Sequence, residues 1–288
     1  DDLFRKEFDL ATKRTSMDSP KLPSDGPMYL SGSIDLRVMQ PSFFSTVANL
    51  PIKWGVVGMG WVANDFMIPS FQYSPHSSLR AIIDSDPQAF AEFTGDFGEK
   101  IECRSSLEDL EDPSGLDAIY ISTPNDQHLR IIEQASSLGI NILCEKPITI
   151  NLEQALEVKE KLIRSKVFFM EGIAYRSHPQ INYIVKLIKQ NAIGKIVKIK
   201  SCFGFNAGKP NKKSRLYNKD LGGGSILDLG CYPISFSNLI ANLNNEKENL
   251  PIINKVKGEF CETGVDTDLY AELKYPNGIV SEIQLSIT

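Results

Sequence analysis

A glycine-containing segment at residues 58–63 could bind a dinucleotide. The sequence GMGWVA follows a predicted strand and opens a predicted helix. Glycines allow the tight turn and let backbone N–H groups approach a pyrophosphate, while the helix N-terminus attracts its negative charge. The predicted contacts in this turn are Gly58, Met59, Gly60, Trp61, Val62 and Ala63. The alternative is an ordinary glycine turn that binds nothing.

An acidic residue favours one form of the cofactor. Asp84 ends the next predicted strand, where a carboxylate can bind the ribose hydroxyls of the adenosine half. A carboxylate there would repel a 2′-phosphate, and the neighbouring Ser85 supplies no cation. NAD is therefore expected rather than NADP, although the sequence does not place Arg80 and Arg104.

Polar residues also follow a later predicted strand, in the segment STPNDQH. The carboxyl ends of parallel strands are where ligands bind in such folds. Helix capping by Asn125 or Asp126 explains the segment equally well. The cofactor contacts predicted in this segment are Ser122, Thr123, Pro124, Asn125 and His128.

These segments need a scaffold of alternating strands and helices. Strands are expected over 52–58, 78–84, 118–123 and 140–145, with helices over 65–73, 87–98, 128–139 and 151–166. Apolar strands that alternate with helices indicate a parallel sheet covered on both faces. The chain is thus expected to be α/β, with an N-terminal Rossmann-type doubly wound sheet. In the helix over 151–166, Leu152, Leu156 and Leu162 are expected to share the buried face, with Val158 near its edge.

The second half of the chain has a different pattern. Helices are expected over 180–193 and 222–243, and strands over 195–205, 253–260 and 267–287, the last range folding back around Pro276-Asn277-Gly278. This pattern predicts a C-terminal α+β domain with an open, mostly antiparallel sheet. The final strand stops at Thr288 without a closing element, so the sheet is expected to be truncated. The expected division is an irregular arm over 1–50, a dinucleotide-binding domain over 51–172 and a substrate or oligomerisation domain over 173–288, incomplete at its end.

Composition excludes several classes of protein. The 288 residues are 42% hydrophobic and carry a net charge of −5, unlike the basic surface of a nucleic-acid-binding protein. No apolar segment approaches the roughly 20 residues that cross a bilayer, and the N-terminus lacks the order of a secretory signal. Five scattered cysteines and three histidines argue against zinc sites and disulfides. A cytoplasmic protein without a metal is expected.

Five segments taken together resemble a known family. GMGWVA, STPNDQH, CEKP, MEGIAYRSHP and GGGSILDLGCYP occur in this order between about residue 52 and the end. The set resembles the Gfo/Idh/MocA oxidoreductases, and most closely their branch of glucose–fructose oxidoreductase, dimeric dihydrodiol dehydrogenase and aldose dehydrogenases. That branch carries tyrosine where many relatives carry histidine, and this chain has Tyr232.

The resemblance implies roles for named residues. Lys146 would be the catalytic lysine, the Lys146–Pro147 bond would be cis, and Asp228 and Tyr232 would complete the catalytic and substrate-binding set. Glu145, Lys146 and Pro147 join the predicted cofactor contacts. Arg176 is a further candidate for binding substrate, with His178 a weaker one. A sugar-like substrate and a homo-oligomer formed through the C-terminal sheet are also implied.

The chemistry of this set can be reasoned from the side chains themselves. Oxidising an alcohol requires a hydride to leave carbon while the hydroxyl loses its proton to a base. Tyrosine has a pKa of about 10 and is a poor base at neutral pH. The Lys146 ammonium is expected to stabilise the phenolate and lower the pKa of Tyr232. Asp228 could bind the substrate hydroxyl or orient Lys146, and lies four residues from Tyr232 on the same predicted helix face.

The resulting expectation is an NAD(P)-dependent dehydrogenase or reductase acting on a sugar, polyol or dihydrodiol. One alternative is an NAD-dependent glycoside hydrolase of the same superfamily, against which Tyr232 argues because such members tend to carry histidine in the last segment. Another is a non-catalytic dinucleotide-binding protein.

Overall fold

The computed structural model describes residues 51–91, 93, 100–244 and 249–288. The arm expected over 1–50 and most of the second half of the helix expected over 87–98 lie outside these residues. Ala174–Lys195 belongs to one compact unit, and the remaining described residues belong to a second. No helix in the described ranges is long and apolar enough to cross a membrane.

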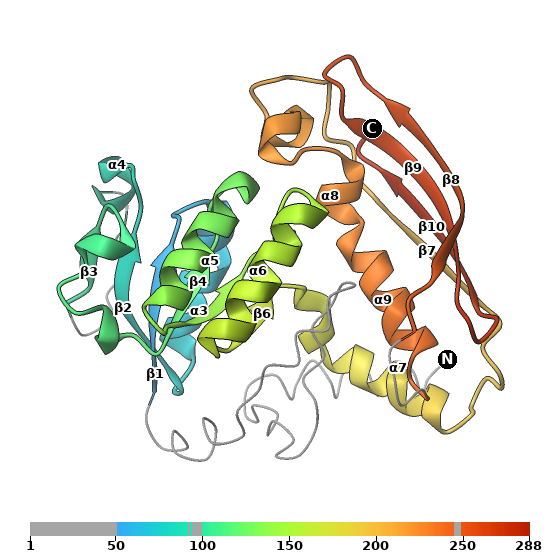
Figure 1. The fold of residues 1–288 in the computed structure, drawn as a ribbon, viewed down its shortest axis with the longest axis horizontal. Coiled ribbons are helices and arrows are strands. Elements are labelled where there is room, and N and C mark those ends of the chain that lie inside the picture. Colours follow the sequence, from blue (N-terminus) through green and yellow to red (C-terminus); the bar gives the residue numbers. More distant parts are fainter. Residues whose placement is uncertain (1–50, 92, 94–99, 245–248) are drawn as a thin grey trace. The chain divides into compact units, whose positions relative to one another are not determined.

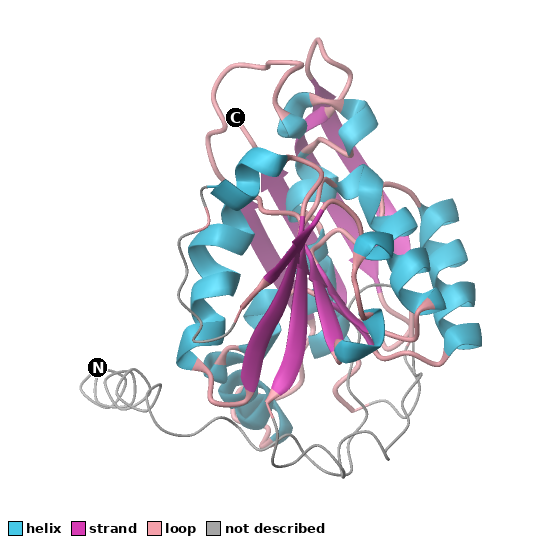
Figure 2. Cartoon of the chain, turned by 90° about the vertical axis from the view of Figure 1, so that its left-hand side faces the viewer, coloured by secondary structure: helices cyan, strands magenta, loops and turns pink. Residues whose placement is uncertain are grey.

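The first half of the chain forms a six-stranded parallel sheet (Figures 1 and 2). Its strands are β1 (Ile52–Val57), β2 (Ser77–Ile83), β3 (Glu102–Arg104), β4 (Ala118–Ile121), β5 (Asn141–Cys144) and β6 (Phe169–Glu171), in the order β3-β2-β1-β4-β5-β6. The predicted Rossmann-type sheet is confirmed. The three-residue strand β3 was not predicted, because so short a segment carries little periodicity.

Helices cover both faces of this sheet, as Figure 2 shows. A helix from Trp61 to Tyr73 contains a π-helical stretch (Ala63–Met67) followed by α3 (Ile68–Tyr73). The other helices of this half are α4 (Pro87–Ala91), α5 (His128–Ser137) and α6 (Leu152–Ser165). Neighbouring strand residues point to opposite faces. Val56 packs with Ile68 and Phe71 on one face, while Val57 belongs to the core beneath α5 and α6 on the other.

The expected buried face of α6 was partly wrong. Leu152 and Leu156 are exposed, at 68% and 48%, whereas Ala155, Val158 and Leu162 are buried. Residues at i, i+3 and i+7 share a helix face. The helix packs against α5, and the choice of buried face depends on the packing partner rather than on which residues are most apolar.

The second half builds a four-stranded sheet of β7 (Lys198–Gly204), β8 (Ile252–Phe260), β9 (Asp266–Lys274) and β10 (Val280–Ser286). The order is β7-β10-β9-β8, with β7 and β10 parallel and the other pairs antiparallel. Tyr275 and Ile279 close the predicted turn between β9 and β10. The open, mostly antiparallel sheet is therefore confirmed.

Two helices, α8 (Ser225–Leu229) and α9 (Cys231–Ala241), lie along one side of this sheet (Figure 1). They replace the single helix expected over 222–243 and meet at Gly230. The buried hydroxyls of Ser237 and Ser281 contact each other at 2.7 Å, which joins α9 to β10. In the separate unit, α7 (Pro179–Lys189) ends four residues before its expected end.

Candidate active site

The glycine turn after β1 has no space for a side chain at Gly58. Gly58 has a φ of +91°, and a Cβ there would lie 2.8 Å from the backbone nitrogen of Thr123. The following helix starts with a hydrogen bond from Asn64 N to Gly60 O. The N–H groups that precede this bond have no acceptor within the helix. The turn thus presents backbone donors beside a surface without a Cβ, the arrangement that accommodates a pyrophosphate.

Asp84 lies beside this turn. One carboxylate oxygen accepts a hydrogen bond from Met59 N at 2.7 Å, and the other accepts from Asp86 N at 2.8 Å. Both arginines that the sequence left unplaced are directed elsewhere. Arg104 binds Glu111 at 2.6 Å and Glu102 at 3.0 Å, and Arg80 lines a cavity along β1 and β2.

The segment after β4 completes the edge of the sheet. The Ser122 hydroxyl donates to Gly58 O at 2.7 Å, which ties this segment to the glycine turn. Thr123 Oγ1 is buried without a hydrogen-bond partner in the described part of the chain. A buried polar atom normally has a partner. An orphaned hydroxyl beside the glycine turn therefore fits a site that a polar ligand such as a dinucleotide completes.

His128 lies inside the protein rather than at the edge. Its side chain is fully buried, with Nδ1 2.9 Å from Pro147 O and Nε2 3.0 Å from Thr123 O. Burial lowers the pKa of this imidazole. His128 thus connects the segment after β4 to the segment after β5 and positions both.

Glu145 and Lys146 follow β5, and the Lys146–Pro147 bond is cis, as the resemblance implied. The Glu145 carboxylate accepts a hydrogen bond from the hydroxyl of Tyr120 at 2.7 Å. Burial, followed by the charge of Glu145, raises the pKa of Tyr120. Tyr120 was not predicted as a site residue, because its place within an apolar strand indicates only core packing.

Lys146 and Asp228 form a shielded ion pair. The Lys146 ammonium lies 2.8 Å from the backbone oxygen of Asp228 and 3.3 Å from its Oδ1. The two side chains are 14% and 6% exposed. Arg215 Nη1 lies 3.0 Å from the same Oδ1. Two cations therefore share one carboxylate oxygen, and Arg215 is a site residue that the sequence did not reveal.

The aromatic ring of Tyr232 faces the ammonium group of Lys146. The ammonium is 5.2 Å from the ring centroid, and Phe203 packs edge-on against the ring at 5.2 Å. Burial, and then the neighbouring Cys231, Glu145 and Asp228, raise the pKa of Tyr232, while Arg215 lowers it. The expected lowering of the Tyr232 pKa is therefore contradicted. The ammonium lies over the face of the ring, where it interacts with the π-system.

A buried carboxylate fixes the helix that carries Asp228. Asp266 accepts hydrogen bonds from Ser225 Oγ at 2.5 Å and Ile226 N at 2.8 Å, at the start of α8. Gly224, just before the helix, has a φ of +110°. Asp266 caps the helix from another strand, so β9 determines the position of Asp228.

The remaining predicted residues are placed as follows. Asn125 is buried, with its Nδ2 3.4 Å from Gly222 O. Trp61 is exposed and packs edge-on against Phe66 at 5.1 Å. Arg176 lies in a short 3-10 helix (Ala174–Ser177) of the separate unit, and its contact with substrate stays a prediction. In the same unit, His178 caps α7 by accepting from Gln180 N.

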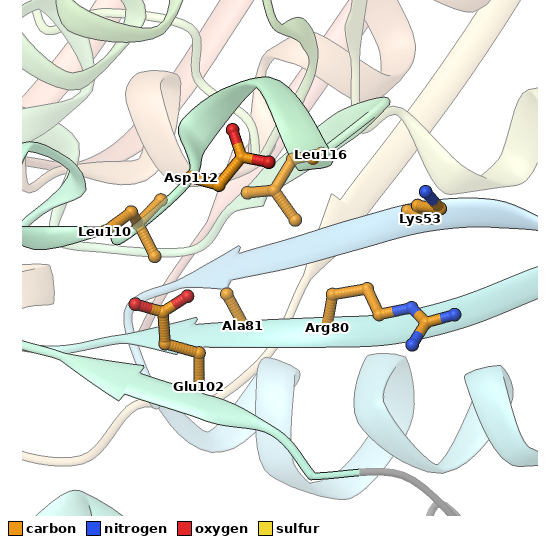
Figure 3. Close-up of a pocket in the computed structure, with 8 residues that line it drawn as sticks. Lys53, Arg80, Ala81, Glu102, Leu110, Asp112 and Leu116 are labelled. Atoms are coloured by element: carbon orange, nitrogen blue, oxygen red, sulfur yellow. The ribbon is translucent and has the colours of Figure 1, made fainter.

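A separate cavity of about 260 Å³ lies along β1 and β2 (Figure 3). Its lining mixes opposite charges, with Lys53 and Arg80 facing a space that also borders Glu102 and Asp112. None of the predicted site residues lines this cavity. The candidate active site is therefore the carboxyl edge of the parallel sheet together with α8 and α9.

Comparisons with known proteins agree with this architecture. A model described as "Oxidoreductase family, NAD-binding Rossmann fold" (GFO_IDH_MocA) matches residues 52–173, and a "GFO/IDH/MocA C-terminal domain" model matches 181–288. The chain is 31% identical over 224 residues to trans-1,2-dihydrobenzene-1,2-diol dehydrogenase of Xenopus tropicalis, covering 77% of this chain and 65% of that protein. It is 28% identical over 235 residues to D-xylose 1-dehydrogenase (NADP(+)) 2 of Haloferax volcanii, covering 82% and 69%.

A solved structure of KijD10, a 3-ketoreductase from Actinomadura kijaniata in complex with NADP and TDP-benzene, has a TM-score of 0.72 to this chain. The two are 25% identical, with 82% of this chain and 70% of that chain covered. The chain thus spans 65% of the length of the Xenopus relative. Both of its halves match the domain models of one family, in the same order. The chain belongs to the Gfo/Idh/MocA oxidoreductase family.

Proposed function

We propose that this chain carries the active site of an NAD(P)-dependent oxidoreductase that acts on a hydroxyl or carbonyl group of a sugar, polyol or dihydrodiol. The observation that supports this most strongly is the cluster of Lys146, Asp228 and Tyr232, two of them joined by a shielded ion pair. Lys146 directly follows β5, which is separated from β1 only by β4 in the sheet. The cluster and the glycine turn therefore lie at one edge of the sheet.

The residues that would hold the dinucleotide are those of the glycine turn, Asp84, the segment from Ser122 to Asn125, and Glu145 to Pro147. A bound nicotinamide cofactor supplies or accepts the hydride. Gly58 and Gly60 provide close approach to the backbone, and Thr123 Oγ1 offers an unused polar atom. His128 holds two of these segments in place from inside.

Tyr232 is the proposed proton donor and acceptor. Its raised pKa keeps the phenol protonated at neutral pH, so it is ready to donate a proton to a carbonyl oxygen. Lys146, held by Asp228, supplies a fixed positive charge toward an oxygen that becomes negative in the transition state. In the oxidative direction Tyr232 must first lose its proton, which alkaline conditions favour.

The names of the relatives support the substrate class. They include a dihydrodiol dehydrogenase, a D-xylose dehydrogenase and a 3-ketoreductase, all of which act at hydroxyl or carbonyl carbons. Arg176 is proposed as an additional substrate contact. Residues 51–172 are proposed as the dinucleotide-binding domain and 173–288 as the substrate and oligomerisation domain.

NAD is the proposed cofactor rather than NADP. Asp84 directs a carboxylate to the turn, and Arg104 is engaged by Glu111 and Glu102. The Haloferax relative and KijD10 are named with NADP, so the preference must come from this chain's own residues.

A homo-oligomer in the cytoplasm is proposed, formed through the second sheet. All nine residues of the edge strand β8 are exposed. Its apolar side chains include Ile253 and Phe260, each 72% exposed. An exposed strand with large apolar side chains is prone to associate with another chain.

The decisive experiment measures formation of NADH and NADPH by the purified protein with a panel of aldoses, inositols and trans-dihydrodiols. We expect turnover of at least one class, with a higher kcat/KM for NAD than for NADP. A Tyr183→Phe variant, which removes the hydroxyl of an exposed tyrosine on α7, is the control for Tyr232→Phe. Bound cofactor without turnover of any panel compound would instead indicate a non-catalytic role.

A further inference from the structure

A basic segment runs from the end of β7 to the start of α8 (Figure 1). Residues 205–224 carry five positive side chains and one acidic residue, Asp220, although the whole chain has a net charge of −5. The five are Lys209, Lys212, Lys213, Arg215 and Lys219, and all are exposed. In the described part of the chain, none of the four lysines forms an ion pair with a carboxylate. Their charge is therefore available to a ligand.

Hydrogen bonds hold this segment in a defined shape. Tyr217 is buried, and its hydroxyl contacts Gly208 O at 2.8 Å and Ile287 O at 3.2 Å, which ties two parts of the segment to the residue that follows β10. Asn211 Oδ1 accepts from Lys213 N at 2.9 Å. The backbone that carries the charges is thus ordered by its own contacts, which lowers the entropic cost of binding a ligand.

Arg215 connects the segment to the reacting groups. Its Nη1 binds Oδ1 of Asp228 at 3.0 Å, and its charge lowers the pKa of Tyr232. Its side chain is nevertheless 51% exposed. A guanidinium carries five N–H donors in a planar fork that matches the oxygens of a carboxylate or phosphate. A single contact with Asp228 leaves donors of Arg215 for a second anion.

We propose that residues 208–219 bind an anionic group of the substrate, so that the enzyme acts on a sugar carrying a carboxylate or phosphate rather than on a neutral sugar. This inference rests on the proposed function and specifies its substrate class. Arg215 would bind the anionic group next to Asp228. Lys212 and Lys213 would add a local positive potential that favours anionic over neutral substrates.

The test is calorimetric titration of the NADH-saturated protein with D-glucose, D-glucuronate and D-glucose 6-phosphate. At least one anionic sugar should bind about tenfold more tightly than D-glucose, as expected for one or two charge-assisted contacts. Preference for D-glucuronate indicates a carboxylate, and preference for the phosphate ester indicates a phosphate. The preference should shrink at 0.5 M salt, because the lysines are exposed.

Two charge-matched variants separate this site from a general effect of net charge. Lys212→Gln/Lys213→Gln should reduce the preference for the anionic sugar, because Arg215 keeps its direct contact while the local positive potential falls. Lys255→Gln/Lys257→Gln on β8 should retain it, since β8 lies at the opposite edge of the sheet from β7. Equal loss in both variants, equal affinity for all three sugars, or no binding of either anionic sugar overturns the inference. A protein that shows the preference but turns over no panel compound would retain this inference and lose the proposed function.

Discussion

The ammonium group of Lys146 lies 2.8 Å from the backbone oxygen of Asp228, although 82 residues separate the two in the sequence. One residue follows a strand of the parallel sheet, and the other lies on a helix packed against the second sheet. Each side chain finds its charged partner only where the parallel sheet meets the helix of the second half. The ion pair is therefore a property of the two halves of the fold together.

The Lys146–Asp228 pair should show strong energetic coupling. Asp228→Asn leaves the shielded Lys146 ammonium without its carboxylate, which is costly, whereas in Lys146→Met the Asp228 carboxylate keeps Arg215. In the double variant both members of the pair are uncharged, and only the half-exposed Arg215 loses its carboxylate. We expect the two free energies of unfolding to be non-additive by about 1–2 kcal/mol, measured by denaturant titration of all four proteins. Additive changes would show that the pair contributes no interaction energy.

Tyr232 should govern both the rate and its pH dependence. Removing the hydroxyl in Tyr232→Phe should lower kcat by about 10²–10⁴-fold, the usual contribution of general acid–base catalysis. In the unaltered protein the raised pKa means that the phenolate becomes more abundant as pH rises through the alkaline range. The rate of alcohol oxidation, measured as NADH formation, should therefore increase with pH. A variant with full turnover, or a flat profile, would contradict the assignment.

Gly58 and Gly60 should respond differently to alanine. Gly58→Ala places a Cβ 2.8 Å from Thr123 N at a positive φ, and should destabilise the protein by about 2 kcal/mol or more. At Gly60 the nearest atom to an added Cβ is Ser122 O, at an ordinary 3.6 Å. Gly60→Ala should therefore leave the thermal midpoint nearly unchanged and weaken NADH binding, measured by fluorescence titration. Equal loss of stability in both variants would contradict this difference.

Asp84 should determine the choice of cofactor. Asp84→Asn keeps an oxygen that can accept from Met59 N and removes the negative charge. We expect the ratio of the NADP and NAD dissociation constants to shift toward NADP by about tenfold, because a like charge beside the 2′-phosphate is lost. Asp86→Asn has the same change in net charge and is the control. A similar shift in both variants would assign the effect to the overall potential.

His128 should make stability depend on pH. Burial lowers its pKa in the folded protein below the value of about 6.5 in the unfolded chain, so the unfolded state binds the proton more readily. The contribution of neutral His128 to stability is complete above the pKa of the unfolded chain and is lost as pH falls through the pKa of the folded protein. The free energy of unfolding should therefore decrease from pH 7 to pH 5 more steeply than in His128→Asn. The exposed His76 provides the control variant.

Local pattern was sufficient for the scaffold. The alternation of apolar strands with helices predicted the parallel sheet, and the Pro276-Asn277-Gly278 turn predicted the last hairpin. The glycine turn and Asp84 were predicted from adjacent residues, since the strand and helix that position them are their immediate neighbours in the chain. These features depend on contacts between segments close in sequence.

Packing decided what the pattern left open. Ala155 rather than Leu152 lies on the buried face of α6, since the element that the helix packs against determines which side is buried. The Tyr232 pKa rises although a lysine is nearby, because the ammonium lies over the ring and burial disfavours the phenolate.

The sequence by itself determined the family, the two kinds of sheet and the residues that could do chemistry. Only the tertiary structure brought Arg215 to Asp228 and placed Asp266 at the start of α8. The reason is physical: periodicity and turn chemistry act over a few residues, whereas a shared carboxylate depends on where distant segments pack.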